Sequence, residues 1–197
     1  MIKTILIANR GEIACRIIKT AKKLKMKTVS IYSDSDINAE HVHISDESYH
    51  LGPSEATHSY LNISKIIEIC KKAKVDAVHP GYGFLSENPN FVRELSKNKI
   101  IFIGPSEKAI ISMGDKIKSK TIAEKARVNV VPGFIGEIND IKHAKEIAKK
   151  IGFPVIIKAS AGGGGKGMRI VNSEEEVEEA FLRASSEAKN SFGDERL

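Results

Sequence analysis

The sequence has no tryptophan, only two cysteines and few aromatic residues. Aromatics make up 6% of the 197 residues, so platforms on which nucleic-acid bases could stack are few. Cys15 and Cys70 fit no metal or redox spacing, which predicts two small buried side chains on helices of a protein from a reducing compartment. No apolar run approaches the roughly 18 residues that indicate a membrane span. These absences favour a globular protein, and 41% hydrophobic residues are enough to build its core.

The charge is basic but does not favour a nucleic-acid partner. The formal net charge is +6, and 24 of the 31 basic residues are lysine. Readout of base edges favours arginine, of which there are only seven. The composition therefore predicts a lysine-rich solvated surface around a site for an anionic ligand.

The first residues indicate a compartment. Residues 1–8 begin a strand at once and contain neither a basic and apolar signal sequence nor an Arg- and Ser-rich transit peptide. Together with the missing membrane span, this predicts a cytoplasmic protein.

The first hundred residues alternate apolar runs with amphipathic stretches, as in β-α-β units that build a parallel sheet. The expected strands are residues 5–8, 28–32, 75–79 and 100–103, and the expected helices are residues 12–25, 62–73 and 89–97. This pattern predicts an α/β, doubly wound, Rossmann-like domain over residues 1–113. A break at Gly104-Pro105 and a change of pattern place a second domain at residues 114–197.

A glycine cluster is the strongest local signal. Gly162 to Gly165 leave their N–H groups unshielded, and Lys166 and Arg169 add positive charge, which suits phosphate oxygens. A Walker A loop fails twice, because Ser160 replaces its first glycine and Gly167 its Ser/Thr. The β-rich flanks favour a hairpin lid instead, and a plain flexible loop is the alternative.

Two lysines sharpen this interpretation. Lys158 lies in an otherwise apolar strand, where a buried ammonium is costly unless an anion such as a triphosphate pairs with it. The alternative is that Lys158 lies at an exposed strand end. Asp115 is expected to cap a helix whose first turn contains Lys116, a cation placed against the helix dipole.

Three other patterns leave alternatives open. Residues 8–14 imitate a dinucleotide-binding turn, with Asp34 in place of the ribose-binding acid, but two of the three glycines are missing and Glu12 would face the pyrophosphate. Residues 79–88 follow a strand end, so they could form a ligand site or an ordered turn. His41 and His43 would share one side of a strand, and a solvated pair is favoured over zinc.

Four blocks in order along the chain resemble the biotin carboxylase family. They are Ile7-Ala8-Asn9-Arg10-Gly11-Glu12-Ile13-Ala14, His79-Pro80-Gly81-Tyr82-Gly83-Phe84-Leu85-Ser86-Glu87-Asn88, Met113-Gly114-Asp115-Lys116 and residues 158–169. Within the family, residues 13–16, Ala161, Lys166 and residues 191–194 look most like the α subunit of propionyl-CoA carboxylase. Acetyl-CoA carboxylase and pyruvate carboxylase are close alternatives.

The resemblance implies a pre-ATP-grasp domain followed by the first part of an ATP-grasp domain, with the glycine hairpin as its lid. It implies that ATP and Mg²⁺ activate bicarbonate as carboxyphosphate, and that CO₂ then passes to biotin on a carrier domain or protein. A carboxyltransferase subunit and a homodimer are the implied partners. The implied ATP-binding residues are Lys116, Lys158, Gly162, Gly163, Gly164, Gly165, Lys166, Gly167 and Met168. Tyr82 and Gly83 match a segment near the biotin pocket.

The resemblance also implies residues that these 197 do not include, namely the magnesium ligands, a bicarbonate-binding arginine and a general base. No catalytic residue and no metal ligand is therefore assigned here. Half of an ATP-grasp domain would leave apolar strand faces uncovered, so we expect an inactive fragment. A non-catalytic remnant with a binding or assembly role is the alternative.

Overall fold

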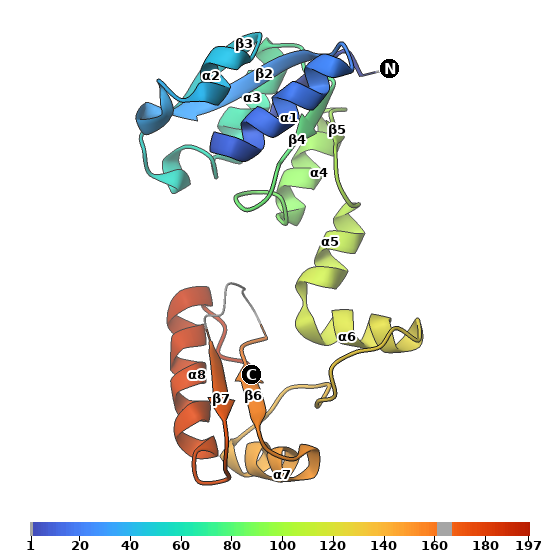
Figure 1. The fold of residues 1–197 in the computed structure, drawn as a ribbon, viewed down its shortest axis with the longest axis vertical. Coiled ribbons are helices and arrows are strands. Elements are labelled where there is room, and N and C mark those ends of the chain that lie inside the picture. Colours follow the sequence, from blue (N-terminus) through green and yellow to red (C-terminus); the bar gives the residue numbers. More distant parts are fainter. Residues whose placement is uncertain (1, 161–166) are drawn as a thin grey trace. The chain divides into compact units, whose positions relative to one another are not determined.

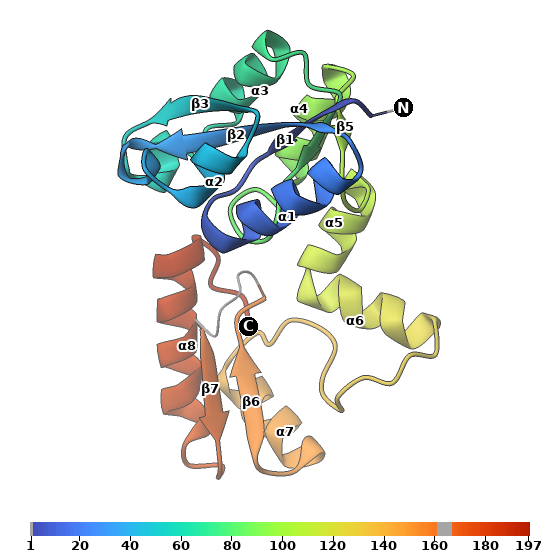
Figure 2. The ribbon, with the colours of Figure 1, turned by 45° about the horizontal axis from the view of Figure 1, so that its top comes forward.

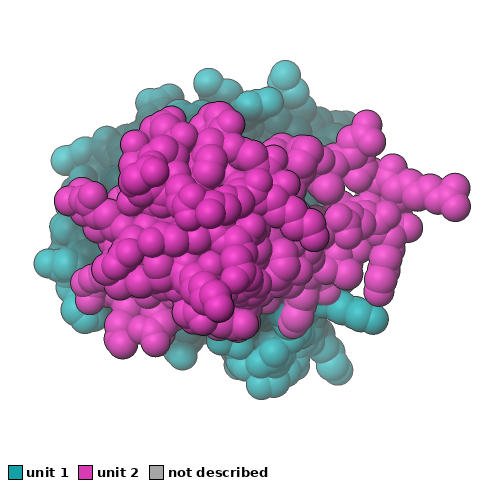
Figure 3. All heavy atoms as spheres, turned by 90° about the horizontal axis from the view of Figure 1, so that it is seen from below, with its two compact units in different colours: residues 1–111 teal, residues 112–197 magenta. Residues whose placement is uncertain are grey.

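The computed structural model of the protein describes residues 2–160 and 167–197, without the side chains of residues 116 and 192. It divides into two compact units, residues 1–111 and 112–197, which are coloured separately in Figure 3. Each unit has its own buried core. The two units are therefore described one at a time.

The first unit is a five-stranded parallel sheet with helices on both faces (Figure 1). The strand order is β3-β2-β1-β4-β5, so the chain runs outward from β1 to one edge and then returns to the other side of β1. The elements are β1 (Thr4–Ile7), α1 (Gly11–Lys23), β2 (Lys27–Ser33), α2 (Glu40–Ile44), β3 (Glu47–Gly52), α3 (Ile63–Lys72), β4 (Ala77–His79), α4 (Pro89–Lys97) and β5 (Ile101–Phe102), and α5 (Glu107–Gly114) crosses the boundary between the units. The predicted doubly wound architecture is confirmed.

Alternation along β1 explains the two cores of this unit. Leu6 points to one face, where it packs in a cluster with Ile66 of α3 and Phe91 of α4. Ile5 and Ile7 point to the other face, where they pack with residues of α1. Because both faces of the sheet are covered, β1 is apolar throughout, as a central strand of a parallel sheet should be.

The helix α2 and the strand β3 were not predicted, and the prediction for the two histidines of α2 was wrong. His41 and His43 lie in the short helix α2 rather than on a strand. The His41 side chain is fully buried and His43 is exposed, so the two rings do not form a pair. Among the described residues, no group of three or more His, Cys, Asp or Glu could hold a metal ion.

Both cysteines are free thiols, as predicted, but only one is fully buried. Cys70 of α3 belongs to the core of the first unit. Cys15 of α1 is half-buried, and this burial is the main reason why its pKa is raised. Both thiols are therefore protonated in the physiological range, which suits apolar packing.

The second unit is a β-hairpin covered on one face by helices (Figure 2). Its elements are α6 (Lys116–Lys125), α7 (Ile141–Ile151), β6 (Val155–Lys158), β7 (Met168–Val171) and α8 (Val177–Phe192). β6 and β7 pair antiparallel, with Lys158 opposite Met168. The core joins Ala144 and Ala148 of α7, Ile157 of β6, and a row of alanines on α8. No helix among the described residues is long and apolar enough to cross a membrane.

Burial of His41 makes the stability of the first unit depend on pH. Its Nε2 lies 3.2 Å from the carbonyl oxygen of Ile31, and its buried Nδ1 has no partner among the described residues. Loss of hydration, joined by the nearby Arg10, lowers the pKa of His41 below its ordinary value of about 6.5, although Ile31 and Asp36 oppose this. The unfolded chain therefore takes up this proton first as the pH falls, and unfolding becomes more favourable below about pH 6.5.

We expect the free energy of unfolding to fall between pH 7 and pH 5, and to fall less steeply in a His41→Gln variant. Gln can still donate to the Ile31 carbonyl but does not titrate. Urea unfolding followed by circular dichroism measures both slopes, and His43→Gln on the same helix is the matched control. Equal slopes for the wild type and His41→Gln would contradict this explanation.

Candidate functional site

The β6–β7 hairpin has one covered and one open face. Alternation places Val155 and Ile157 of β6 against the helices. The neighbouring positions Ile156 and Lys158 lie on the other face, across from Ile170 and Met168 of β7. Ile156 is 50% exposed and Ile170 is 66% exposed. The open face therefore combines two aliphatic side chains and a thioether with one ammonium group.

Lys158 is exposed at the end of β6, so the preferred prediction of a buried ammonium was wrong and the alternative of an exposed strand end is confirmed. A two-stranded sheet with helices on one side leaves every second residue of each strand in solvent. Lys158 falls on that open side, next to Ile156 along the same face. The lysine is therefore available to an anion without first losing its hydration to the protein.

Most of the glycine cluster lies outside the described residues. This holds for Gly162, Gly163, Gly164, Gly165 and Lys166. The strands on either side of the cluster do form an antiparallel pair, which confirms the predicted β-rich flanks. A Walker A loop would instead lead from a strand into a helix.

Gly167 closes the end of the hairpin. Its φ of +67° lies in the left-handed region, and a Cβ there would lie 2.8 Å from the Cβ of Ala159. Its carbonyl oxygen accepts a hydrogen bond of 2.8 Å from the amide of Ala159. Only glycine satisfies both the backbone angle and the close approach.

The last residues of the chain hold the segment that follows β6. The amide of Ser160 donates to the carbonyl oxygen of Arg196 over 2.8 Å, and the amide of Ile138 donates to that of Leu197 over 2.9 Å. Leu197 is buried in the core of this unit. The guanidinium of Arg196 pairs with Asp194 and lowers the pKa of that carboxyl group to about 2. These contacts fix the start of the glycine segment to the rest of the unit.

Lys116 is the first residue of α6, as expected. Asp115 caps the helix by accepting from the amides of Ile117 and Lys118 at 3.0 and 2.8 Å. The bond from Lys118 is the main reason why the pKa of Asp115 is lowered, and Arg196 contributes through its charge. The capping prediction is confirmed, whereas the side chain of Lys116 is outside the described part of the chain.

Tyr82 and Gly83 lie at a second place, in the first unit. β1 and β4 are neighbours, and the strand order reverses between them. Open α/β sheets bind ligands outside the carboxyl ends of the strands at such a reversal. The segment after β4 therefore occupies the position at which this fold class places its ligands.

Most of the 79–88 block has a structural role, and Tyr82 and Gly83 are exceptions. Pro80 and Leu85 are buried, and Asn88 caps α4 by accepting from the amides of Asn90 and Phe91. Tyr82, in contrast, is 61% exposed. A Cβ added at Gly83 would have no other described heavy atom within 4 Å. Tyr82 and Gly83 therefore combine exposure with a place at the strand reversal, next to the segment that follows β1.

The dinucleotide alternative is not supported by the contacts of its residues. Asp34 pairs with His50 over 2.6 Å on the far side of β2 from β1. Arg10 pairs with Asp36 over 2.9 Å, and Glu12 accepts a hydrogen bond of 2.5 Å from the hydroxyl of Tyr82. The turn after β1 is thus engaged with the protein itself. Sequence reasoning did not assign these contacts, and it also missed Ile156 and Ile170, which the alternation of the two strands could have indicated.

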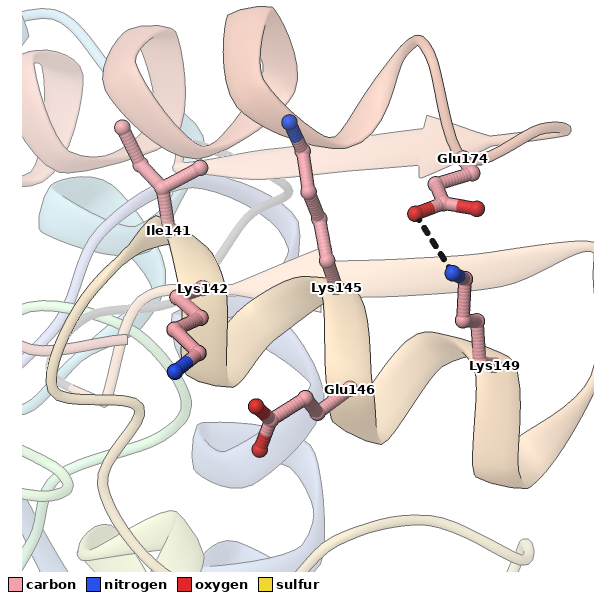
Figure 4. Close-up of a pocket in the computed structure, with 6 residues that line it drawn as sticks. All are labelled: Ile141, Lys142, Lys145, Glu146, Lys149 and Glu174. Carbon is pink, nitrogen blue, oxygen red and sulfur yellow. Dashed lines mark ion pairs between the residues drawn. The ribbon is translucent and has the colours of Figure 1, made fainter.

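A hollow of about 500 Å³ lies along α7, away from the predicted site residues (Figure 4). Its lining consists of Ile141, Lys142, Lys145, Glu146, Lys149 and Glu174. Lys149 pairs with Glu174 over 2.8 Å, and Lys145 pairs with Glu178 over 3.1 Å. Because two of its three lysines are neutralised, we assign no anion site there.

The chain is similar to known proteins along its whole length. The family model described as biotin carboxylase, N-terminal domain, matches residues 1–110, and that described as carbamoyl-phosphate synthase L chain, ATP binding domain, matches residues 115–197. The chain is 55% identical over 193 residues to the human propionyl-CoA carboxylase alpha chain, mitochondrial. That match covers 98% of this chain and 26% of the relative, so the chain spans about a quarter of the relative's length.

Solved structures show the same fold. The biotin carboxylase of Campylobacter jejuni, solved as a β-γ-ATP complex, matches with a TM-score of 0.96 at 48% identity, over 100% of this chain and 44% of that one. The biotin carboxylase domain dimer of 2-oxoglutarate carboxylase from Hydrogenobacter thermophilus was solved with MgADP, ADP and bicarbonate. It matches with a TM-score of 0.93 at 46% identity, over 100% of this chain and 43% of that one.

We expect Gly167→Ala to destabilise the second unit by about 1–3 kcal/mol. A left-handed backbone costs a residue with a Cβ about 1–2 kcal/mol, and the contact with Ala159 adds to this. Denaturant unfolding measures the loss. Gly114→Ala is the matched control, because Gly114 has no positive φ and open space at its Cβ position. An equal loss in both variants would argue against the strained turn.

Proposed function

We propose that this chain, which belongs to the biotin carboxylase family, supplies the nucleotide-binding part of an ATP-dependent ligase that carboxylates biotin. The family's N-terminal domain matches residues 1–110. The observation that carries this proposal is the open face of the β6–β7 hairpin. That face combines an apolar surface with the exposed ammonium group of Lys158 beside a glycine-rich segment. The Campylobacter relative, of the same fold, was solved as a β-γ-ATP complex.

The open face suits both ends of ATP. Ile156, Ile170 and Met168 offer an apolar surface to the flat base. Lys158 offers a charge to the phosphates, and the N-terminus of α6 at Lys116 offers another. We propose that Gly162, Gly163, Gly164, Gly165, Lys166 and Gly167 close over the phosphates as a lid.

Magnesium and bicarbonate complete the proposed reaction. ATP would enter as its magnesium complex, and positioning with charge neutralisation would promote transfer of its γ-phosphoryl group to bicarbonate. Mg²⁺ prefers carboxylate oxygens, and the described open face of the hairpin has none. We therefore assign the hairpin to the nucleotide and assign no metal ligand or catalytic residue to this chain.

Biotin is the proposed second substrate, with Tyr82 and Gly83 at its pocket. Their support is the strand reversal between β1 and β4 and the exposure of both residues. A biotin carboxyl carrier domain or protein would deliver the biotin, and a carboxyltransferase subunit would accept the carboxyl group and select the acyl-CoA, with propionyl-CoA favoured by the human relative.

A homodimer and a cytoplasmic location complete the proposal. The dimer is supported by the Hydrogenobacter relative, which was solved as one. The cytoplasmic location stays a proposal, and the human relative differs in being named as mitochondrial.

We expect Lys158→Met to weaken the binding of Mg-ATP by roughly 10- to 100-fold, since a hydrogen bond to a charged group contributes about 1.5–3 kcal/mol. Isothermal titration calorimetry of the 197-residue chain measures this change. Lys150→Met, an exposed lysine at the end of α7, removes the same charge from the same unit and is the matched control. Equal affinities for both variants would contradict the role of Lys158. If the wild-type chain does not bind Mg-ATP, the proposed nucleotide-binding role itself is contradicted.

A further inference from the structure

Three residues that follow β1 hold the segment after β4, two by direct hydrogen bonds and one through intervening side chains. This segment, residues 80–84, is called the Tyr82 loop here. Asn9 contacts its backbone, Glu12 contacts its tyrosine, and Arg10 reaches Phe84 through two other side chains. About seventy residues separate the two segments in the sequence.

Asn9 fixes the backbone of the loop. Its Nδ2 donates to the carbonyl oxygens of Pro80 and Tyr82, each over 2.7 Å, and its Oδ1 accepts from the amide of Arg10 over 2.9 Å. Two acceptors on one side and a donor on the other permit only one orientation of the amide. Asn9 is buried, and its bond to Pro80 is buried with it, whereas the bonds to Tyr82 and Arg10 are partly buried.

Gly81 allows this close approach. It lies between the two carbonyl groups that Asn9 binds, and its φ is +65°. A Cβ at this position would lie 2.7 Å from Nδ2 of Asn9. Its amide donates to Nδ1 of His79 over 3.0 Å, which fixes the beginning of the turn.

Arg10 holds the far end of the loop indirectly. Its Nη1 donates to Asp36 over 2.9 Å, and the other carboxylate oxygen of Asp36 accepts from the hydroxyl of Tyr60 over 2.7 Å. The ring of Tyr60 stacks on Phe84 with 4.9 Å between centroids. The loop is therefore held at its start, its middle and its end.

Glu12 orients the exposed aromatic ring of the Tyr82 loop. The Tyr82 hydroxyl donates to Glu12 Oε1 over 2.5 Å, while the ring itself is 61% exposed. An exposed tyrosine has no need of a fixed ring for folding, because little of its surface is removed from water. The open space at Gly83 adjoins this ring at the strand reversal. The arrangement is that of a platform held ready for a ligand.

We propose that Asn9, Arg10 and Glu12 are positioning residues that hold the Tyr82 loop as a preformed platform, and that Glu12 sets the orientation of the Tyr82 ring against the bound substrate. The choice of biotin as that substrate rests on the proposed function. The positioning itself rests only on the contacts above.

The first experiment tests the Glu12 contact without any ligand. The hydrogen bond to the carboxylate raises the pKa of Tyr82 above its ordinary value of about 10. In ¹³C-tyrosine NMR, with Tyr82→Phe to assign the signal, Glu12→Gln should return the titration of Tyr82 toward that value. Glu87→Gln removes the same charge from an exposed site that follows the same loop and should leave the titration unchanged. The proposal is overturned if Tyr82 titrates alike in the wild type and in Glu12→Gln.

The second experiment tests positioning, with biotin as the probe in an NMR titration of the 197-residue chain. We expect Glu12→Ala and Tyr82→Phe each to weaken binding about fivefold or more, and the double variant to be no weaker than either, because both remove the same contact. Glu12→Gln, which keeps an acceptor, should recover most of the affinity. Unchanged affinity in Glu12→Ala would overturn the positioning role.

The two experiments also separate the two proposals. If the wild-type chain binds no biotin, the assignment of biotin to this loop fails, and the Tyr82 titration still decides whether Glu12 holds the ring. Asn9 is buried, so Asn9→Leu is a secondary variant whose folding must first be verified by circular dichroism.

Discussion

The side-chain amide of Asn9 links the ends of two strands that lie about seventy residues apart in the sequence. β1 and β4 pair in parallel, and the amide of Ala8 continues their ladder by donating to the carbonyl oxygen of His79. Beyond that bond the backbones separate, and Asn9 supplies the polar contacts that the ladder no longer provides. Without it, the carbonyl groups of Pro80 and Tyr82 would lose their partners at a partly buried site, which is costly. The exposed ring of Tyr82 therefore has a defined position because the buried side-chain amide of Asn9 binds the backbone of its loop.

The helices and strands predicted from the sequence were those whose pattern reflects a fully covered sheet. The apolar spacing of α1, α3 and α4 indicated each helix, because each packs one continuous apolar face on the sheet. β3 and α2 escaped prediction for a physical reason. β3 is an edge strand with exposed residues at alternate positions, and α2 has only five residues. The position of α2 depends on burial of His41, which is a tertiary contact that no local pattern reveals.

The candidate site likewise has features that local sequence patterns predict and features that depend on tertiary contacts. The glycine cluster and its β-rich flanks could be recognised along the chain, because glycine preferences and strand patterns are local. The choice between a buried and an exposed Lys158 could not be made from the sequence, since the apolar run of β6 looks the same whether one face of the strand is covered or both. The contact between Glu12 and Tyr82 was also beyond the sequence, because it depends on which strands are neighbours. Glu12 had been weighed only as an obstacle to a pyrophosphate, whereas the structure makes it an acceptor for a hydroxyl group.

The two units prepare for a ligand in different ways. In the first, two sets of hydrogen bonds and one ring stack fix the Tyr82 loop before anything binds, so little conformational freedom remains to be lost on binding. In the second, the hairpin keeps Ile156 and Ile170 in water, where apolar surface is unfavourable by roughly 25 cal/mol per Å². A flat base laid on that face would remove this surface from water, while Lys158 beside it meets the charge of the phosphates. Under the proposed function, the first unit would gain affinity from a preformed loop, and the second from the apolar surface that its ligand covers. Substitutions in the first would then alter the orientation of the ligand, and those in the second the affinity for the nucleotide.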